Sequence, residues 1–196
     1  MTLTVPDVRF DEDGLVPVIL QDAVTGEILT LAYANAEALA KTAETGETWL
    51  YSRSRRALWH KGETSGHVQR VESWHADCDQ DALVFRVHPT GPACHRGTRS
   101  CFDGAAPPLL ALEDRLADRK ANAPSDSWTA KLLADPNLRH KKLGEEAVEL
   151  ALACATKDEA AVVSEAADLV YHVAVAALGR DVPLRDVVEE LARRLR

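Results

Sequence analysis

The chain has 196 residues, of which 46% are hydrophobic and 28% charged, and its net charge is −8. This composition is that of one large or two small globular domains, and it excludes a chain that is mainly disordered. Acidic residues outnumber basic ones in both halves and no basic face stands out, so we expect no nucleic-acid partner.

The first fourteen residues are polar and acidic, without the basic start and apolar core of a signal peptide. No apolar run approaches the roughly 20 residues that a membrane helix needs. We therefore expect a cytoplasmic protein with no membrane partner. Because disulfides are rare in the cytoplasm, the four cysteines are more typical of metal ligands or core residues.

The first half is predicted to be rich in strands, with one or two helices. The expected strands cover residues 16–22, 27–33, 49–52 and 83–87. A turn at Gly26 joins the first two strands into a hairpin. Asn35 is a typical cap for a helix over about 36–45, which Gly46 ends.

A helical period replaces the strand pattern after Pro107. Helices are expected near 109–121, 128–134, 138–155, 159–179 and 184–195. The change of period places a domain boundary near 103–108. The sequence therefore predicts an α+β, β-rich domain at 1–105 and an all-α helical bundle at 106–196.

The segment Asp77-Cys78-Asp79-Gln80-Asp81 carries the most chemical information. If it is extended, its three aspartates point to one side and Cys78 points to the other. Three carboxylates on one face repel each other unless a cation lies among them, and hard oxygen ligands favour Mg²⁺.

Cys94 and Cys101 lie a few residues further on, in a stretch with the loop-forming residues Gly91, Pro92 and Gly97. Three thiolates would leave the fourth position of a tetrahedral Zn²⁺ open for water, which is the catalytic arrangement. The alternative is a set of scattered small buried cysteines beside a solvated acidic turn.

Upstream, Ser-Arg-Ser-Arg at 52–55 precedes a stretch at 58–67 rich in Gly, Ser and Thr, with a lysine. Backbone N–H groups and hydroxyls in such a loop can hold a phosphate. Many surface loops share this composition, so an ordinary surface loop remains the alternative.

Taken in chain order, four motifs are distinctive: Ser-Arg-Ser-Arg, Leu-Trp-x-Lys-Gly-Glu-Thr-Ser-Gly, Asp-Cys-Asp-x-Asp and Gly-Pro-x-Cys-His-x-Gly-x-x-Ser-Cys-Phe. Together they resemble the phosphoribosyl-AMP cyclohydrolase family over residues 14–102. The resemblance implies hydrolytic opening of the adenine ring of phosphoribosyl-AMP at the N1–C6 bond. Methionine is usual in the family where Thr30 and Ala34 stand here, at what look like packing positions.

The same resemblance implies particular ligands and an obligate homodimer whose zinc cysteines come from two chains. It places Zn²⁺ on Cys78, Cys94 and Cys101, and Mg²⁺ on Asp77, Asp79 and Asp81. His95 is implied as the general acid or base near the zinc water. Substrate phosphates and ribose are assigned to Ser52, Arg53, Lys61, Thr64, Ser65 and Gly66.

Two carboxylate pairs lie on the predicted helices of the second half. Glu146 and Glu149 share one helix face, and Glu165 and Asp168 repeat the spacing on the next helix. A capping box at 156–159 predicts a turn between these helices, so the pairs lie side by side and need a cation such as Mg²⁺. The alternative is two solvated helix faces. Cys154 and His172 are expected to be packed residues.

The basic residues Arg139, Lys141 and Lys142 precede the first pair and suit a polyphosphate substrate. Ser-Trp-Thr-Ala-Lys-Leu-Leu at 127–133, Lys-Lys-Leu-Gly-Glu-Glu-Ala-Val-Glu at 141–149 and Glu-Ala-Ala-Asp-Leu-Val-Tyr-His at 165–172 resemble phosphoribosyl-ATP pyrophosphohydrolase over residues 109–196. That family belongs to the all-α nucleotide pyrophosphohydrolases.

This second resemblance implies release of pyrophosphate from phosphoribosyl-ATP, leaving phosphoribosyl-AMP. It places Mg²⁺ on Glu146, Glu149, Glu165 and Asp168, with Glu145 as a further ligand or as the group that activates water. Lys141 and Lys142 are implied as substrate contacts.

The two resemblances together predict a bifunctional hydrolase for the second and third steps of histidine biosynthesis. Three alternatives stay open. One half could be only a dimerisation module, the chain could bind metal without catalysis, or it could be a general nucleotide pyrophosphohydrolase that acts on ordinary nucleoside triphosphates.

Overall fold

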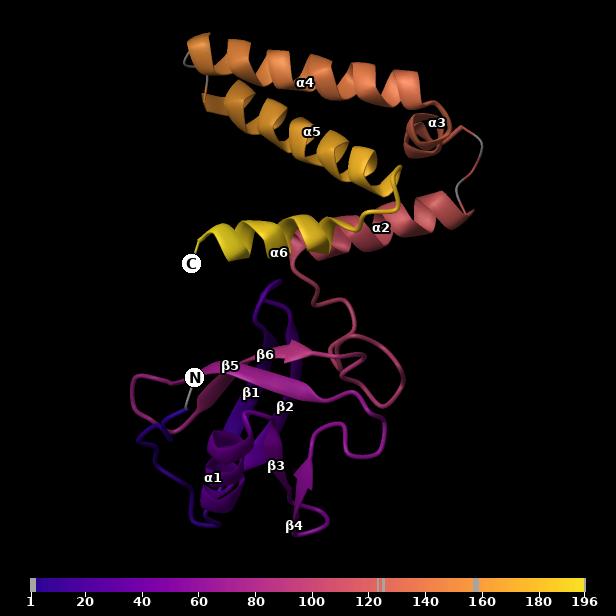
Figure 1. Cartoon of the computed structure of the whole chain (residues 1–196). Coiled ribbons are helices and arrows are strands. Elements are labelled where there is room, and N and C mark those ends of the chain that lie inside the picture. Colours follow the sequence, from indigo (N-terminus) through magenta and orange to yellow (C-terminus); the bar gives the residue numbers. More distant parts are fainter. Residues whose placement is uncertain (1–2, 123, 125, 157–158, 196) are drawn as a thin grey trace. The chain divides into compact units, whose positions relative to one another are not determined.

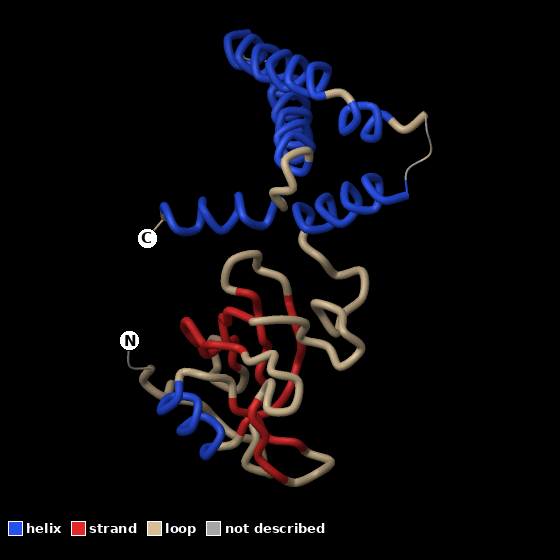
Figure 2. Tube along the Cα trace, turned by 45° about the vertical axis from the view of Figure 1, so that its right-hand side comes forward, coloured by secondary structure: helices blue, strands red, loops and turns tan. Residues whose placement is uncertain are grey.

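The computed structural model of the chain describes residues 3–122, 124, 126–156 and 159–195. The chain divides into two compact units, Met1–Ala106 and Pro107–Arg196. The first unit is built mainly from strands and the second from helices (Figures 1 and 2). The predicted fold class, a β-rich domain followed by an all-α domain, is confirmed.

A four-stranded mixed sheet in the order β2-β1-β6-β5 forms the centre of the first unit. Its strands are β1 (Val16–Asp22), β2 (Ile28–Ala34), β5 (Gln69–Ala76) and β6 (Leu83–Pro89). The central strands β1 and β6 run parallel, and each edge strand pairs antiparallel with its neighbour. Alternate residues of β1 and β6 are buried, so one face of the sheet supplies the core.

One helix and a small second sheet complete this unit: α1 (Ala36–Thr45), β3 (Trp49–Ser52) and β4 (Ala57–His60). The Asn35 side chain accepts a hydrogen bond from the Ala38 N–H at 2.8 Å, and Gly46 ends α1 with a φ of 71°. Both ends of this helix lie where the sequence predicts them, because a side-chain cap and a left-handed glycine are strong local signals.

Two strands, β4 and β5, are not predicted by the sequence pattern. The pairing of β5 with β6 shifts register between Val71 and Ser73, which breaks the alternation of buried and exposed side chains. Strand β4 has four residues, of which none is buried. Short strands with mixed burial lack the period on which prediction from sequence depends.

The second unit contains α2 (Pro108–Asn122), α3 (Trp128–Ala134), α4 (Pro136–Thr156), α5 (Glu159–Leu178) and α6 (Leu184–Arg194). All five match the predicted helices to within a few residues. The long helices α4 and α5 lie side by side and antiparallel (Figure 1). The expected capping box at their turn includes residues 157–158, which lie outside the described residues.

One sequence-based expectation about the helices is wrong. Cys154 is exposed rather than packed in a core. Helix α5 is long and apolar enough to cross a membrane by length and composition, with a mean hydropathy of 1.5 and 17% of that window buried. A search for uninterrupted apolar runs misses it because Glu165 and Asp168 interrupt the run, whereas an average over the helix tolerates them.

Candidate active sites

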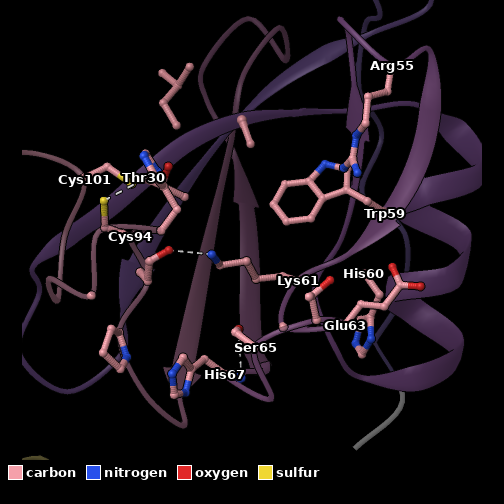
Figure 3. Close-up of a pocket in the computed structure, with 18 residues that line it drawn as sticks. Thr30, Arg55, Trp59, His60, Lys61, Glu63, Ser65, His67, Cys94 and Cys101 are labelled. Atoms are coloured by element: carbon pink, nitrogen blue, oxygen red, sulfur yellow. Dashed lines mark hydrogen bonds between the residues drawn. The ribbon is translucent and has the colours of Figure 1, made fainter.

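A cavity of about 510 Å³ opens in the first unit, a volume typical of small-molecule sites (Figure 3). Residues of β2, of the segment that follows β4 and of the loop after β6 line it. The lining side chains that can take part in binding or proton transfer are Thr30, Arg55, Trp59, His60, Lys61, Glu63, Thr64, Ser65, His67, Cys94, His95 and Cys101.

Cys94 and Cys101 both face this cavity (Figure 3). The pKa of the Cys94 thiol is lowered to about 7, first by a hydrogen bond from the backbone N–H of Arg96 and then by the hydroxyl of Thr98, with Cys101 contributing. A thiol with this pKa is about half ionised near neutral pH, and the thiolate is the form that ligates a metal. The ring Nδ1 of His95 lies 3.9 Å from the Cys94 sulfur.

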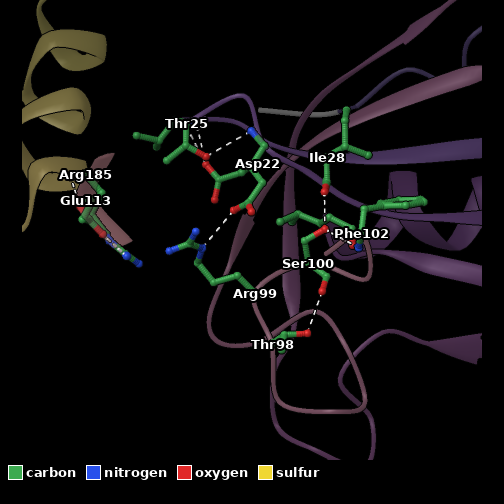
Figure 4. A network of polar contacts seen from close by, with 12 residues as sticks. Asp22, Thr25, Ile28, Thr98, Arg99, Ser100, Phe102, Glu113 and Arg185 are labelled. Carbon is green, nitrogen blue, oxygen red and sulfur yellow. Dashed lines mark hydrogen bonds and ion pairs between the residues drawn. The ribbon is translucent and has the colours of Figure 1, made fainter. Parts of the chain in front are cut away.

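Contacts with the β1–β2 hairpin hold the cysteine loop in place (Figure 4). The Ser100 hydroxyl donates to the Ile28 carbonyl at 2.7 Å, and the Cys101 N–H donates to the Leu29 carbonyl at 2.8 Å. The guanidinium of Arg99 donates to the carboxylate of Glu27 at 3.1 Å, and Glu27 is buried. The second cysteine is therefore fixed against β2.

Lys61 reaches the same loop from the opposite wall of the cavity. Its ammonium donates to the Ala93 carbonyl at 2.5 Å (Figure 3). Burial lowers the pKa of Lys61, and the nearby thiols of Cys101 and Cys94 partly offset this. A side chain on the next residue, Gly62, would collide with the backbone of His67, so the loop after Lys61 requires glycine.

Three predicted substrate residues, Ser52, Arg53 and Gly66, are not among the residues that line the cavity. The guanidinium of Arg53 lies 3.8 Å above the ring of Tyr33, and the Ser52 hydroxyl accepts a hydrogen bond from the backbone of Arg55. Gly66 closes a turn onto the carbonyl of Gly62. These three residues therefore lie next to the loops that form the cavity, but they do not line the cavity.

Sequence reasoning missed several residues of the cavity, among them Thr30, Arg55, Trp59 and His67. Thr30 was expected at a packing position, yet it faces the cavity. The sequence does offer one indication of this position. Thr30 follows the buried Leu29 in a strand, and neighbouring strand residues point to opposite faces. Ala34 is fully buried, as a packing residue should be.

Oxygen atoms of Asp77, Asp79 and Asp81 lie within 4.8 Å of one another. The segment is a turn, so the condition of an extended stretch is not met, and Gln80 lies in the left-handed region at a φ of 65°. Although desolvation raises it, hydrogen bonds from the backbone of Ala82 and Asp81 lower the pKa of Asp77 overall. The three aspartates converge because the turn brings them together, and not because the side chains of a strand alternate between its two faces.

The N-terminal segment provides a counter-charge to this acidic turn. The guanidinium of Arg9 lies 3.7 Å from Asp79 and 3.9 Å from Asp81, and the Arg9 N–H donates to the Gln80 carbonyl at 2.7 Å. Cys78 is exposed on the same turn and does not line the cavity that Cys94 and Cys101 share. One chain therefore brings together two of the three predicted zinc cysteines.

A second acidic cluster lies between α4 and α5. Oxygen atoms of Glu146, Glu165 and Asp168 lie within 4.8 Å of one another, and Glu146 is buried. Burial raises the pKa of Glu165, and the charges of Glu149, Asp168 and Glu146 raise it further. Four carboxylates that repel one another in this way could hold a metal ion.

Both predicted substrate lysines contact acids beside this cluster. Lys142 lies 3.0 Å from an oxygen of Glu145 and 3.0 Å from one of Glu146, and these contacts, that with Glu145 first, raise its pKa. Lys141 lies 3.3 Å from Glu145. Arg139, also considered for polyphosphate, is buried and donates to two carbonyls at the end of α3, so it has a structural role.

Two acidic clusters and a thiol-lined cavity, set in a β-rich and an all-helical unit, fit one class of protein: a two-domain hydrolase that uses metal ions. Comparison with known families agrees. The family model described as phosphoribosyl-AMP cyclohydrolase matches residues 30–103, and that described as phosphoribosyl-ATP pyrophosphohydrolase matches residues 109–195.

Curated relatives carry both domains in one chain. A histidine biosynthesis bifunctional protein HisIE of Bacillus subtilis is 47% identical over 96% of this chain and 95% of its own length. Its namesakes in Salmonella typhi and in Nostoc are 47% and 44% identical, covering 93% and 99% of this chain and 92% and 94% of their own. The chain belongs to the HisIE family of bifunctional histidine biosynthesis enzymes.

The predicted activity is thereby confirmed: the chain is a bifunctional hydrolase that catalyses the second and third steps of histidine biosynthesis. Its substrates are small nucleotides, as the family requires. The three alternatives of a single activity, a non-catalytic metal-binding protein and a general nucleotide pyrophosphohydrolase do not fit a chain that matches both families along nearly its whole length.

Proposed function

We propose that the activities are divided at the predicted boundary, with cyclohydrolase at 1–105 and pyrophosphohydrolase at 106–196. The second domain hydrolyses phosphoribosyl-ATP to phosphoribosyl-AMP and pyrophosphate. The first domain then opens the adenine ring of that product at N1–C6. Support comes from the two family matches, which end and begin on either side of this boundary.

The proposed zinc ligands are Cys78, Cys94 and Cys101, contributed by two chains of a homodimer. The donor set fits, because soft thiolates favour Zn²⁺ and the Cys94 thiol has a pKa of about 7. Three protein ligands leave one position open. Sharing between chains is supported by the exposed position of Cys78, away from the cavity of the other two cysteines.

Zinc, when bound there, makes a water molecule nucleophilic near neutral pH. The proposed role of His95 is to take a proton as the water attacks C6 and to return one to N1 as the ring opens. Its ring already lies beside Cys94, at the edge of the cavity. Lys61 and the hydroxyls of Thr64 and Ser65 orient the substrate phosphate and ribose.

The rest of the substrate loop and the acidic turn complete this domain. Ser52, Arg53 and Gly66 are proposed to shape the phosphate-binding loop from its border. The three aspartates of the acidic turn, Asp77, Asp79 and Asp81, are proposed to hold Mg²⁺, which oxygen ligands favour.

In the helical domain the proposed Mg²⁺ ligands are Glu146, Glu149, Glu165 and Asp168. The convergence of three of these carboxylates is the single observation that carries this site. Magnesium, when bound, offsets phosphate charge and orients the attacking water. Glu145 takes the proton of that water, while Lys141 and Lys142 exchange their contacts with acids for contacts with the substrate phosphates.

An apolar face on α4 and α5 supports the proposed homodimer. It consists of the side chains Val148, Leu152, Val163, Val170 and Val173, which are 37–71% exposed. Exposed apolar patches of this kind mark interfaces. We propose that a second copy of the chain covers this face, rather than a bilayer, which agrees with a cytoplasmic enzyme.

The shared zinc site has a sharp test, in which zinc per chain is measured in wild type and in the variants Cys78→Ser, Cys94→Ser and Cys154→Ser. Cys154 is a matched control because it is an exposed cysteine outside both sites. Both Cys78→Ser and Cys94→Ser should lose zinc, while Cys154→Ser should keep it.

Mixed dimers of Cys78→Ser and Cys94→Ser chains then separate sharing from a site within one chain. If the cysteines are shared, each mixed dimer regains one intact site and part of its ring-opening activity. If all three ligands come from one chain, no mixture of the two variants regains zinc, and the proposal of a shared site is wrong.

A further inference from the structure

His172 lies on α5, on the same face as Glu165 and Asp168, because it follows them by seven and four residues. It is turned toward α4, where its Nε2 lies 3.7 Å from Oε1 of Glu146. Both side chains are more than nine-tenths buried, His172 with 4% and Glu146 with 6% exposed. Of the three clustered carboxylates, Glu146 is the buried one.

Packing fixes the orientation of this imidazole ring. The ring of Tyr171 meets it edge-on, with the ring centres 5.1 Å apart, and the Tyr171 hydroxyl lies 2.8 Å from the Thr129 hydroxyl on α3. Within the part of the chain that the structure describes, Nδ1 of His172 has no hydrogen-bond partner. The polar contact of the ring is therefore directed at Glu146.

Two nitrogen groups thus approach the same oxygen of Glu146 from two helices. Lys142 lies 3.0 Å from Oε1 on the side of α4, and His172 faces it from α5. Both contacts are made to Oε1, so Oε2 is the oxygen that would serve a cation. A small movement of Glu146 would shorten the contact with His172 to a hydrogen bond, whose usual N···O distance is about 2.9 Å.

We propose that His172 is a positioning residue of the pyrophosphohydrolase site, whose Nε2–H holds the carboxylate of Glu146 in the orientation that binds the metal. The inference rests on the proposed magnesium site. Residues that donate hydrogen bonds to metal-ligating carboxylates fix their orientation, and their loss typically weakens metal binding by about 10- to 100-fold. Lys142 can then give up its contact with Glu146 and bind a substrate phosphate, because His172 still holds the Glu146 carboxylate in place.

The test measures Mn²⁺ binding to the full-length protein by electron paramagnetic resonance, without substrate. Mn²⁺ binding that is present in wild type and absent in Glu146→Gln is assigned to the helical metal site. His172→Phe keeps the ring volume but removes the donor, whereas the amide of His172→Gln reaches about as far as Nε2. We expect His172→Phe to weaken Mn²⁺ binding at this site by about 10-fold or more, and His172→Gln to stay within about threefold of wild type.

Two further variants separate positioning from packing. Tyr171→Phe keeps the ring that packs against His172 and removes only a hydroxyl that contacts Thr129 rather than Glu146, so it should leave Mn²⁺ affinity nearly unchanged. His172→Asn is polar but too short to reach Glu146, and it should weaken binding as His172→Phe does. If His172→Phe does not fold, as judged by thermal unfolding of the metal-free protein, the comparison of His172→Asn with His172→Gln decides.

Equal Mn²⁺ affinity in wild type, His172→Phe and His172→Asn would overturn the inference and leave His172 as a packing residue. If wild type and Glu146→Gln bind the same number of Mn²⁺ ions, the proposed metal site itself is wrong and the inference falls with it. Catalysis gives a second readout: the loss in His172→Phe should be recovered by excess metal, with KM for phosphoribosyl-ATP nearly unchanged at saturating metal.

Discussion

The chain has two candidate sites, a carboxylate site in the helical unit and a cysteine and aspartate site in the β-rich unit, and they are built in contrasting ways. In the helical unit, all proposed ligands come from two neighbouring helices at spacings of three residues. In the β-rich unit, the ligands come from a turn and a loop that long-range contacts hold, and Cys78 lies apart from Cys94 and Cys101. A helix pair specifies a site through local geometry, whereas loops specify one only through the rest of the fold and, in the proposed shared site, through a partner chain.

The two units nevertheless share one structural feature. Each acidic cluster has a basic side chain of the same chain beside it, Arg9 at the aspartates and Lys142 at Glu146. The contacts of Lys142 are closer and partly buried, while those of Arg9 are exposed and longer. Such cations reduce repulsion among carboxylates before metal binds, and the helical site depends on this more because its acids are more buried.

The largest expected effect separates the two units by activity. Glu146→Gln should reduce pyrophosphate release from phosphoribosyl-ATP on the order of a thousandfold, because it removes a buried metal ligand, and should leave ring opening of phosphoribosyl-AMP unchanged. Separate assays of the two steps check this. Retention of pyrophosphate release would exclude Glu146 as a ligand.

The reciprocal variant is Cys94→Ser. It should slow ring opening by about a hundredfold or more, since the thiolates that hold the zinc are no longer complete, with pyrophosphate release intact. The comparison with Cys154→Ser controls for loss of a thiol as such. A parallel decrease of both activities would show that the two units depend on each other for folding.

A smaller effect is expected where the cysteine loop is attached to the hairpin. Glu27→Gln breaks the pair with Arg99, whose side chain is 31% exposed, so screening by water limits the loss of unfolding free energy to about 1–2 kcal/mol. Urea unfolding measures this, and zinc affinity should fall as well. The exposed pair Arg96–Asp103 offers the control, because water screens it and Asp103→Asn should leave the urea midpoint nearly unchanged.

The smallest effect is a pH dependence of the metal-free helical unit. The pKa of Glu165 is raised in the folded state, so its protonated form favours folding. This contribution is complete below the ordinary glutamate pKa of 4.5 and is lost as pH rises through the raised value. The melting temperature of the metal-free protein should fall over this range relative to Glu165→Gln, and Mg²⁺ should restore it at neutral pH. A constant difference between the two proteins would contradict this.

Features with local causes were predictable from the sequence. The caps Asn35 and Gly46 fix the ends of α1, and the carboxylate spacing places Glu146 near Glu165 and Asp168 once two helices pair. The cysteine and aspartate motifs were found as patterns of residue types. Each of these depends on neighbours within a few residues or on one helix pairing.

Features with non-local causes were not predictable. The bulge near Val71 hides β5 from the sequence pattern, and the left-handed Gln80 makes residues 77–81 a turn rather than an extended segment. Thr30 faces the cavity because the loop carrying Cys101 packs on β2. Burial of His172 against Glu146 depends on how α4 and α5 are oriented about their axes, which the apolar surroundings on both helices leave undetermined.

The most direct test of two separate metal-dependent sites in one chain is an incubation of the purified protein with phosphoribosyl-ATP, Mg²⁺ and Zn²⁺, in which nucleotides and pyrophosphate are followed by chromatography. Wild type should give pyrophosphate and the ring-opened product, Cys94→Ser should accumulate phosphoribosyl-AMP, and Glu146→Gln should leave phosphoribosyl-ATP intact yet open added phosphoribosyl-AMP. Ring-opened product from Cys94→Ser at the wild-type rate, or pyrophosphate release by Glu146→Gln, would contradict the account.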